Sequence, residues 1–197
     1  MEQLKERSLT EERDWIEAAR RGDIEGWEHL VETHQQSIFR LAYLLLGDAD
    51  DAEDIAQETF IHAYRALHRF DPTRPFRPWL MRIATNLCRN WHRSLRRYIS
   101  ALQNGLKNEP QPGSTYEQAE HNVEMDNLWK TINSLPLPDQ QVIYLRYFLE
   151  CSETETAEIL GIALGTVKSR SHRALARMRA VLQTQNPVWV QENSDVA

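Results

Sequence analysis

Apolar residues recur every three to four positions along most of the chain, and no segment keeps the strict alternation typical of a half-buried strand. The period is clearest over residues 50–69, where the inward positions are Ala52, Ile55, Ala56, Thr59, Phe60, Ala63 and Leu67. Two further helical runs are predicted between residue 23 and Gly47, and a long basic helix is predicted to open at Phe76 or Pro78. The pattern therefore predicts an all-α fold.

The remaining elements follow from residues that start or stop helices. Thr10 is suited to the N-cap of a helix over residues 10–22, which two glutamates in its first turn would favour. Two prolines forbid a helix over residues 71–75, and we expect a loop there. Nearer the C-terminus, the pattern predicts helices near residues 117–134 and over 139–149.

The helical pattern dissolves over residues 100–116, where asparagine, proline and glycine are frequent. We interpret this segment as a flexible linker between two small helical domains, residues 1–99 and 117–183. Residues 184–197 are expected to form a loose tail, although Trp189 is an unusual side chain to leave in water.

The second domain contains the features of a helix-turn-helix. Ser152, with Glu155 at the capping-box position, can begin a short helix, and Gly161 suits the left-handed residue that ends it. A second helix is then predicted from Leu164 to about Leu182, and its charged residues are all basic: Lys168, Arg170, Arg173, Arg177 and Arg179. A DNA recognition helix needs such cations together with short polar side chains that reach base edges.

The charge distribution supports nucleic-acid binding although the chain is acidic overall. It has 23 basic and 29 acidic residues, for a formal net charge of -6. Residues 65–97, however, hold nine arginines and one acid, Asp71, and the predicted recognition helix is a second basic island. Two basic islands in an acidic chain predict two separate nucleic-acid contacts, although either island alone could be a solvated helix face.

Six acids and no base lie between Asp48 and Glu58. Asp51, Asp54 and Glu58 are spaced to share one helical face, which suits docking on a basic protein surface. The alternative is a solvated first turn, where acids also favour the helix dipole.

Cysteine usage and hydropathy indicate a cytoplasmic protein. Cys88 and Cys151 show no disulfide-framework spacing, as expected in a reducing compartment. The longest apolar run, residues 41–46, is too short to span a bilayer, and the charged N-terminus lacks a signal-peptide core.

Three segments resemble signature motifs of bacterial sigma factors and occur in the family's order. Residues 51–60 (DAEDIAQETF) are similar to the acidic helix of that family, and residues 76–86 (FRPWLMRIATN) to its F-x-x-W-L-x-R-I-A-x-N signature. Residues 165–170 (GTVKSR) are similar to its C-terminal helix-turn-helix. The short linker, with no large intervening domain, resembles the extracytoplasmic-function (ECF) group.

The resemblance implies a promoter-specificity subunit that binds core RNA polymerase, at the beta-prime clamp helices and the beta subunit. The first domain would open and read the −10 element as a single strand, and the second would read the −35 duplex. Polymerase would perform the nucleotide chemistry. The resemblance also implies an anti-sigma factor that hides both DNA surfaces until a signal arrives.

The resemblance assigns residues to each surface. The core polymerase contacts are Asp51, Glu53, Asp54, Gln57 and Glu58. The −10 contacts, beside a loop over residues 69–76 that would hold a flipped non-template base, are Phe70, Arg74, Arg82, Asn86, Asn90, Arg93, Arg96 and Arg97. The −35 contacts are Thr166, Lys168, Ser169, Arg170, His172, Arg173 and Arg177.

Within these sets, residue chemistry refines the roles. Phe70, like Phe76 and Trp79, fits a core position better than a stacking platform. Arg173 is the best candidate for a bidentate guanine contact, worth about 1–3 kcal/mol of discrimination. Arg177 is better suited to the DNA backbone or to solvent than to a base.

Four residues depart from the family pattern. Asn90 stands where many members carry aspartate. Thr156 and Ser171 stand where an aliphatic residue is usual, and we expect them to weaken the core of the second domain. Leu175 replaces a common arginine and alters the outer surface.

Three other functions are open to test. An enzyme or metal protein could use Asp54, Glu58 and His62, or Cys88 and His92, at helical spacing. Because no partner acidic cluster, phosphate-binding glycine loop or nucleophile motif is found, we expect neither catalysis, a metal nor a cofactor. A free-standing regulator would bind duplex DNA without polymerase, and an adaptor would dock on polymerase without opening DNA.

Overall fold

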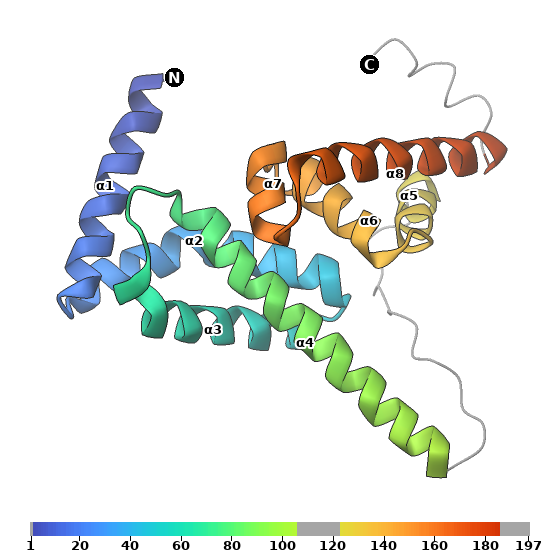
Figure 1. Cartoon of the computed structure of the whole chain (residues 1–197), viewed down its shortest axis with the longest axis horizontal. Helices are drawn as coiled ribbons and strands as arrows, with labels where there is room; N and C mark the ends of the chain where they lie inside the picture. Colours follow the sequence, from blue (N-terminus) through green and yellow to red (C-terminus); the bar gives the residue numbers. More distant parts are fainter. Residues whose placement is uncertain (1, 106–122, 186–197) are drawn as a thin grey trace. The chain divides into compact units, whose positions relative to one another are not determined.

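The computed structural model describes residues 2–105 and 123–185, and it separates the chain into two compact units, residues 1–115 and 116–197. All regular elements in the described residues are helical, as predicted (Figure 1). The first unit contains α1 (Glu2–Arg20), α2 (Ile24–Leu46), α3 (Ala49–Ala66), η1 (Leu67–Arg69) and α4 (Phe76–Gly105). The second contains α5 (Val123–Asn133), α6 (Leu137–Ile143), η2 (Tyr144–Phe148), α7 (Glu153–Leu160) and α8 (Leu164–Gln185).

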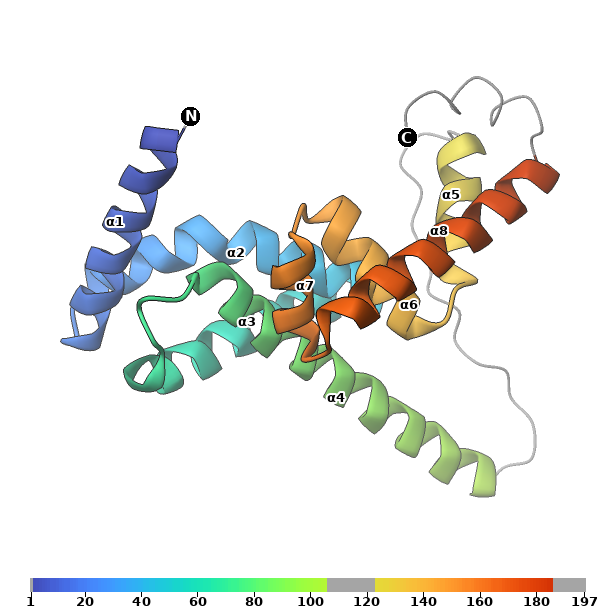
Figure 2. The ribbon, with the colours of Figure 1, turned by 45° about the horizontal axis from the view of Figure 1, so that its top comes forward.

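Helix α2 is the centre of the first unit, because it packs against α1, α3 and α4 (Figure 2). Its residues Leu30, Ile38 and Leu41 are almost completely buried. The inward residues of α3 and α4 that meet this core include Ala52, Ala63, Leu80, Met81 and Ala84. The amphipathic pattern of each helix thus determines which face packs inward and which is left for solvent or a partner.

Local capping explains where the helices of the first unit begin and end. The Asp23 carboxylate accepts the backbone N–H of Glu25 at the start of α2, and Gly47, with φ at +76°, ends that helix as predicted. The Asp48 carboxylate accepts the N–H of Asp51 at 2.9 Å and so caps α3. The predicted loop over residues 71–75 is also confirmed, since η1 ends at Arg69 and α4 begins at Phe76.

Three predicted boundaries in this unit are wrong. Thr10 is not an N-cap, because α1 already begins at Glu2 and the preceding residues contain no helix breaker. The two runs between residues 23 and 47 form one helix, since residues 32–37 contain no proline or glycine and the buried His34 continues the inward face between them. Helix α4 also continues to Gly105, six residues into the predicted linker. The remainder of that linker, residues 106–116, lies outside the described residues.

The second unit is organised around α8, which packs against α5, α6 and α7. Its residues Val167, Ala174 and Met178 face the core as the sequence predicts. The helix predicted over residues 139–149 is divided into α6 and the wider turn η2, in which the Leu149 N–H donates to Tyr144 O at 3.0 Å. Residues 117–122 and the tail from 186 onward, with Trp189, lie outside the described residues.

The helix-turn-helix forms as its local chemistry predicts. Ser152 and Glu155 complete a reciprocal capping box, with N–H···O distances of 2.7 and 3.1 Å. Gly161 adopts the left-handed conformation, with φ at +66°, and ends α7. The chain then turns into α8 within three residues. Among the helices in the described part of the chain, none combines the length and apolar character that crossing a membrane requires.

Candidate nucleic-acid and polymerase interfaces

The loop between η1 and α4, residues 70–75, is held by its own turns. The Asp71 carboxylate accepts the Thr73 N–H at 2.9 Å and the Thr73 O–H at 2.7 Å, and the Arg74 N–H donates to Asp71 O at 3.0 Å. The Thr73 hydroxyl is the main reason why the pKa of Asp71 lies below its ordinary value, with smaller contributions from the Thr73 N–H and from Arg74 and Arg20. The loop therefore presents an ordered, ionised carboxylate and the exposed Arg74 to solvent.

Phe70 does not belong to the DNA-contact set. Its side chain is only 5% exposed, and its ring packs 4.7 Å from Trp79 and 5.3 Å from Phe76, centroid to centroid. A base could stack on this ring only if the loop core came apart. Phe70 is therefore a core residue beneath the loop, which agrees with the aromatic cluster inferred from its sequence.

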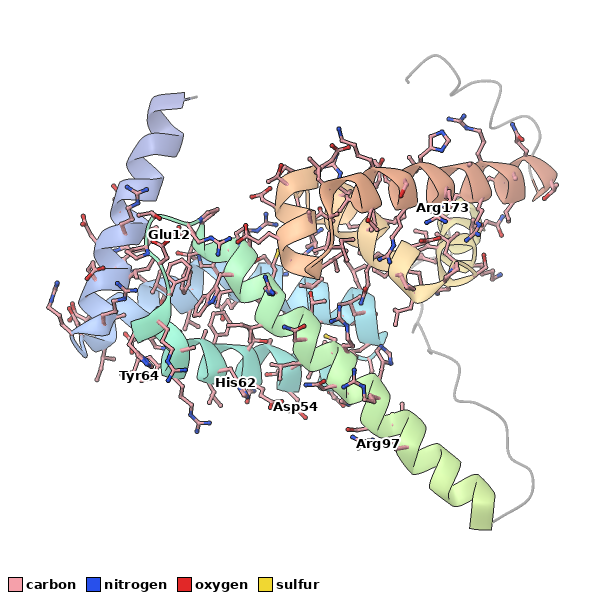
Figure 3. The ribbon with its side chains drawn as sticks, in the orientation of Figure 1. Glu12, Asp54, His62, Tyr64, Arg97 and Arg173 are labelled. Carbon is pink, nitrogen blue, oxygen red and sulfur yellow. The ribbon has the colours of Figure 1, made fainter. Side chains whose placement is uncertain are left out.

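Helix α4 carries a basic, amide-bearing face opposite its buried residues. Leu80, Ala84 and Cys88 face the core, whereas the exposed residues include Arg82, Asn86, Asn90, Arg93 and Arg97. Arg89 donates to the Asn86 side chain at 3.3 Å, and Arg97, labelled in Figure 3, donates to Ser94 at 3.2 Å. The structure thus places five predicted −10 residues on one helix. The side chain of Arg96 lies outside the described part.

The acidic face of α3 is exposed as predicted. Glu53, Asp54, Gln57 and Glu58 are exposed, and Asp54 lies on the outward side of the helix with His62 and Tyr64 (Figure 3). Asp51 is half-buried, and burial raises its pKa, which the neighbouring carboxylates of Asp48, Asp54 and Asp50 raise further. The carboxylates on this face therefore repel one another, and a basic partner would reduce that repulsion.

A hollow of about 530 Å³ between α2 and α3 adjoins that acidic face. Glu53 and Gln57 form part of its wall, and the remaining lining residues are Val31, Gln35, Gln36, Phe39, Ala56, Phe60 and Ile61. Ile61 is 51% exposed. The lining residues of α2 were missed by sequence reasoning, because nothing in their spacing shows that α3 leaves a gap beside them.

Helix α8 exposes most of its predicted −35 set. Lys168, Ser169, His172 and Arg173 are exposed, and Thr166 and Arg170 are half-buried. The Arg173 Nε–H donates to its own helix at Ser169 O, 3.3 Å away, and Figure 3 shows the residue on α8. Lys168 lies 3.6 Å from the Glu153 carboxylate in an exposed pair, which is weak enough to be exchanged for a phosphate.

Arg177 is also exposed, but it is held by a partner within the second unit. Its guanidinium lies 3.1 Å from the carboxylate of Asp139 on α6, and the Asp139 side chain is only 9% exposed. Arg177 therefore has a structural role, because its departure would leave a buried carboxylate unpaired. Its contact with the DNA backbone stays a prediction, since the side chain is 54% exposed.

The unusual residues of the second unit have identifiable consequences. Thr156 is completely buried, and its hydroxyl has no hydrogen-bond partner within residues 2–105 and 123–185. Ser171 is half-buried and lies within hydrogen-bond distance of the Tyr147 hydroxyl, at 3.2 Å. Leu175 is 39% exposed and lies on the outer surface. Of these residues that differ from the family pattern, Thr156 is thus the one expected to lower the stability of the fold, because its buried hydroxyl is unpaired in the described residues.

Neither candidate metal pair has the geometry of a site. His62 lies 3.4 Å from Glu58 in an exposed contact. His92 Nε2 is 2.9 Å from Leu45 O, and burial raises the pKa of Cys88 to about 12, so its thiol stays protonated. Within the described ranges, no three acidic, histidine or cysteine side chains are placed to share an ion.

Comparisons with known proteins identify the family. Residues 30–98 match Sigma-70 region 2, and residues 125–178 match Sigma-70, region 4. The ECF RNA polymerase sigma factor SigW of Bacillus subtilis (strain 168) is 36% identical over 177 residues, which are 85% of this chain and 95% of SigW. The chain belongs to the ECF family of sigma factors. The family predicted from three motifs is therefore confirmed.

Other members of the sigma factor family are similar over most of their length. The RNA polymerase sigma factor CnrH of Cupriavidus metallidurans is 30% identical over 175 residues, 84% of this chain and 91% of CnrH. A solved structure of CnrH in complex with the cytosolic domain of CnrY matches with a TM-score of 0.67 at 27% identity, over 88% of this chain and 98% of CnrH. The sigma factor RpoE of Bartonella quintana, solved with the anti-sigma factor NepR, shares the fold at 23% identity and a TM-score of 0.67, over 81% and 98% of the two chains.

Proposed function

We propose that this sigma factor directs core RNA polymerase to specific promoters and starts transcription in response to a signal. The observation that carries the proposal is the combination of surfaces: one acidic face on α3 and two basic faces, on α4 and α8, in separate units. Polymerase performs the nucleotide chemistry, and both proteins act in the cytoplasm.

The acidic face of α3 docks on the beta-prime clamp helices of core polymerase. Glu53, Asp54, Gln57 and Glu58 are exposed for this contact, and a basic partner would relieve the repulsion around Asp51. The adjoining hollow between α2 and α3 offers apolar contact area beside the charges. The second unit binds the beta subunit.

The loop and α4 bind the opened −10 element. Because the loop is ordered by Asp71 and Thr73, a flipped base meets a formed surface without the cost of ordering it. Asn86 and Asn90 contact the strand from α4. The exposed arginines of that helix and loop neutralise phosphates: Arg74, Arg82, Arg93 and Arg97. We propose the same role for Arg96 from its place in the sequence.

Helix α8 reads the −35 element in the major groove. Arg173, whose guanidinium is exposed, contacts a guanine, and Ser169 and His172 contact neighbouring base edges. Lys168 exchanges its weak pair with Glu153 for a phosphate. Thr166 and Arg170 contact the DNA backbone near the start of the helix.

An anti-sigma factor holds the chain inactive until the signal arrives. Support comes from the relative CnrH, whose structure was solved in complex with the cytosolic domain of CnrY. A partner that covers the two basic faces would block both DNA contacts at once.

Promoter selection with reconstituted holoenzyme tests the proposal. The full chain is mixed with bacterial core polymerase, and transcribed fragments are recovered from a random promoter pool. We expect stable association and enrichment of paired upstream and downstream elements. Arg173→Ala should relax the preference at one upstream position, whereas Arg179→Ala, a matched exposed arginine on α8, should not. Failure to associate, or sequence-specific duplex binding that needs no polymerase, would refute the proposal.

A further inference from the structure

We propose that Arg20, at the end of α1, is a positioning residue for the −10 loop: its guanidinium fixes the loop in the shape that receives a base. The inference rests on the proposed function of that loop. It assigns a role in promoter opening to the N-terminal helix, which carries none of the predicted DNA contacts.

All three nitrogens of the Arg20 guanidinium are engaged. The Nε–H donates to Leu67 O at 3.1 Å, Nη2 donates to Phe70 O, and Nη1 lies 2.9 Å from the Glu17 carboxylate. Leu67 and Phe70 are the first residue of η1 and the residue after its end. Arg20 therefore bridges two carbonyl groups at the point where the chain leaves the helices and enters the loop.

Helix α1 also supports the other end of the loop. The Glu12 carboxylate lies 2.8 Å from His34 Nε2, within hydrogen-bond distance, and both side chains are largely buried, at 16% and 6% exposure. The His34 ring packs 5.5 Å from the ring of Phe76, the first residue of α4. Glu12 is seen on α1 beside the loop in Figure 3, and Figures 1 and 2 both show the loop running alongside α1.

The two anchors act on the same short segment. Phe70, the first residue of the loop, and Phe76, the residue after it, pack edge to face at 5.3 Å, so a displacement at one end is transmitted to the other. Pro72 and Pro75 remove much of the remaining backbone freedom between them. Once Arg20 fixes the residues at the start of the loop, few loop conformations remain. Binding of a base then does not have to include the entropic cost of ordering the loop.

The contacts also exclude a direct role for Arg20 in phosphate binding. Its side chain is only 20% exposed, and its donors face the Leu67 and Phe70 carbonyls and the Glu17 carboxylate. Loss of a phosphate contact lowers the salt dependence of DNA binding, whereas loss of a positioning contact leaves that dependence unchanged. The two roles are therefore separable by experiment.

The experiment compares Arg20→Ala and Arg20→Lys with Arg21→Ala, which removes the same charge from the next, exposed residue. Amide hydrogen exchange is measured over residues 67–75 in the free full chain. Core polymerase affinity, the rate of −10 opening on a selected promoter and the salt dependence of promoter binding are measured with the holoenzyme. Lysine keeps the charge but cannot donate in the same fork, so it should restore opening only in part.

For Arg20→Ala we expect faster exchange over residues 67–75, unchanged core affinity, an unchanged salt slope and opening slower by about tenfold, the scale of a lost charged hydrogen bond. Unchanged loop exchange, unchanged opening, a reduced salt slope or an equal loss in Arg21→Ala would overturn the inference. If the wild-type holoenzyme opens no promoter, the proposed function itself fails. The exchange data then still decide whether Arg20 anchors the loop.

Discussion

Arg177 on α8 and Asp139 on α6 form an ion pair with an Nη1–Oδ2 distance of 3.1 Å. The Asp139 side chain is 9% exposed and that of Arg177 is 54% exposed. A buried carboxylate needs a partner, and the arginine supplies it while its outer edge stays in solvent. The pair therefore joins α8 to the helix α6 that supports it.

Replacing Arg177 should affect stability and leave recognition unchanged. We expect Arg177→Ala to lower the free energy of unfolding by about 1 kcal/mol, because solvent screens the exposed arginine and limits the loss. The preference for the −35 element should stay the same. Urea unfolding and promoter selection measure the two effects. A relaxed sequence preference, of the kind expected for Arg173→Ala, would show that Arg177 reads a base.

Removing the buried hydroxyl of Thr156 should stabilise the chain. Thr156→Val keeps the shape of the side chain and eliminates a polar group that has no partner in the described residues, so we expect a gain of about 1 kcal/mol. Thr131→Val is the matched control, because the Thr131 hydroxyl is also buried but donates to Asn127 O at 2.7 Å. Thermal unfolding compares the two. A gain in the control as large as in Thr156→Val would contradict this explanation.

Sequence reasoning predicted elements best where local chemistry determines them. Gly47 and Gly161 adopt left-handed conformations, and Ser152 and Glu155 form the predicted capping box. These features involve residues at most a few positions apart. The early start of α1 was missed because residues 2–9 contain no distinct signal for a helix start. The continuity of α2 was missed because the polar residues 32–37 separate its two apolar runs, although none of them is a proline or glycine.

The sequence predicted which faces of the candidate site are exposed, but not which residues elsewhere in the fold its side chains contact. The helical period correctly predicted that Lys168 and Arg173 are exposed, because the spacing of residues determines which of them share a helix face. Contacts across the fold carry no such signal. Arg177 and Asp139 are 38 residues apart, and Arg20 and Phe70 are 50 apart. Sequence spacing alone does not relate residues at such separations.

Gly26 allows α1 and α2 to approach closely, and adding a methyl group there should separate them. A Cβ atom at Gly26 would lie 2.8 Å from the Ala18 Cβ and 3.0 Å from Trp15 O. We expect Gly26→Ala to destabilise the first unit by about 1–3 kcal/mol. Gly165→Ala is the control, since its Cβ would meet nothing within 4 Å and alanine favours a helix. Equal unfolding midpoints for the two variants would contradict the close approach.

The Cys88 thiol should resist alkylation in the folded chain. Burial raises its pKa to about 12, so the reactive thiolate is scarce at mildly alkaline pH. We expect iodoacetamide to label Cys88 slowly in native protein and at the ordinary rate in urea, as measured by mass spectrometry. Labelling of the native chain at the unfolded rate would show an accessible thiolate and would reopen the Cys88–His92 metal pair as a candidate.

Asp51, a predicted polymerase contact, should weaken the fold in its ionised form. Burial, followed by the carboxylates of Asp48, Asp54 and Asp50, raises its pKa above the ordinary 3.8, so the folded chain holds the proton more strongly than the unfolded chain. The stability that protonated Asp51 contributes is therefore present below that ordinary value and is lost as pH rises through the raised pKa.

Asp51→Asn removes this titration. We expect a small rise in the free energy of unfolding at neutral pH, a shallower decline between acid and neutral pH, and weaker binding to core polymerase. Asp50→Asn, at an exposed neighbour outside the predicted contact set, should change both properties less. Urea titrations over a pH series and core-binding measurements test the prediction. A variant that is less stable at neutral pH, or that binds core polymerase as tightly as the wild type, would refute the corresponding half of it.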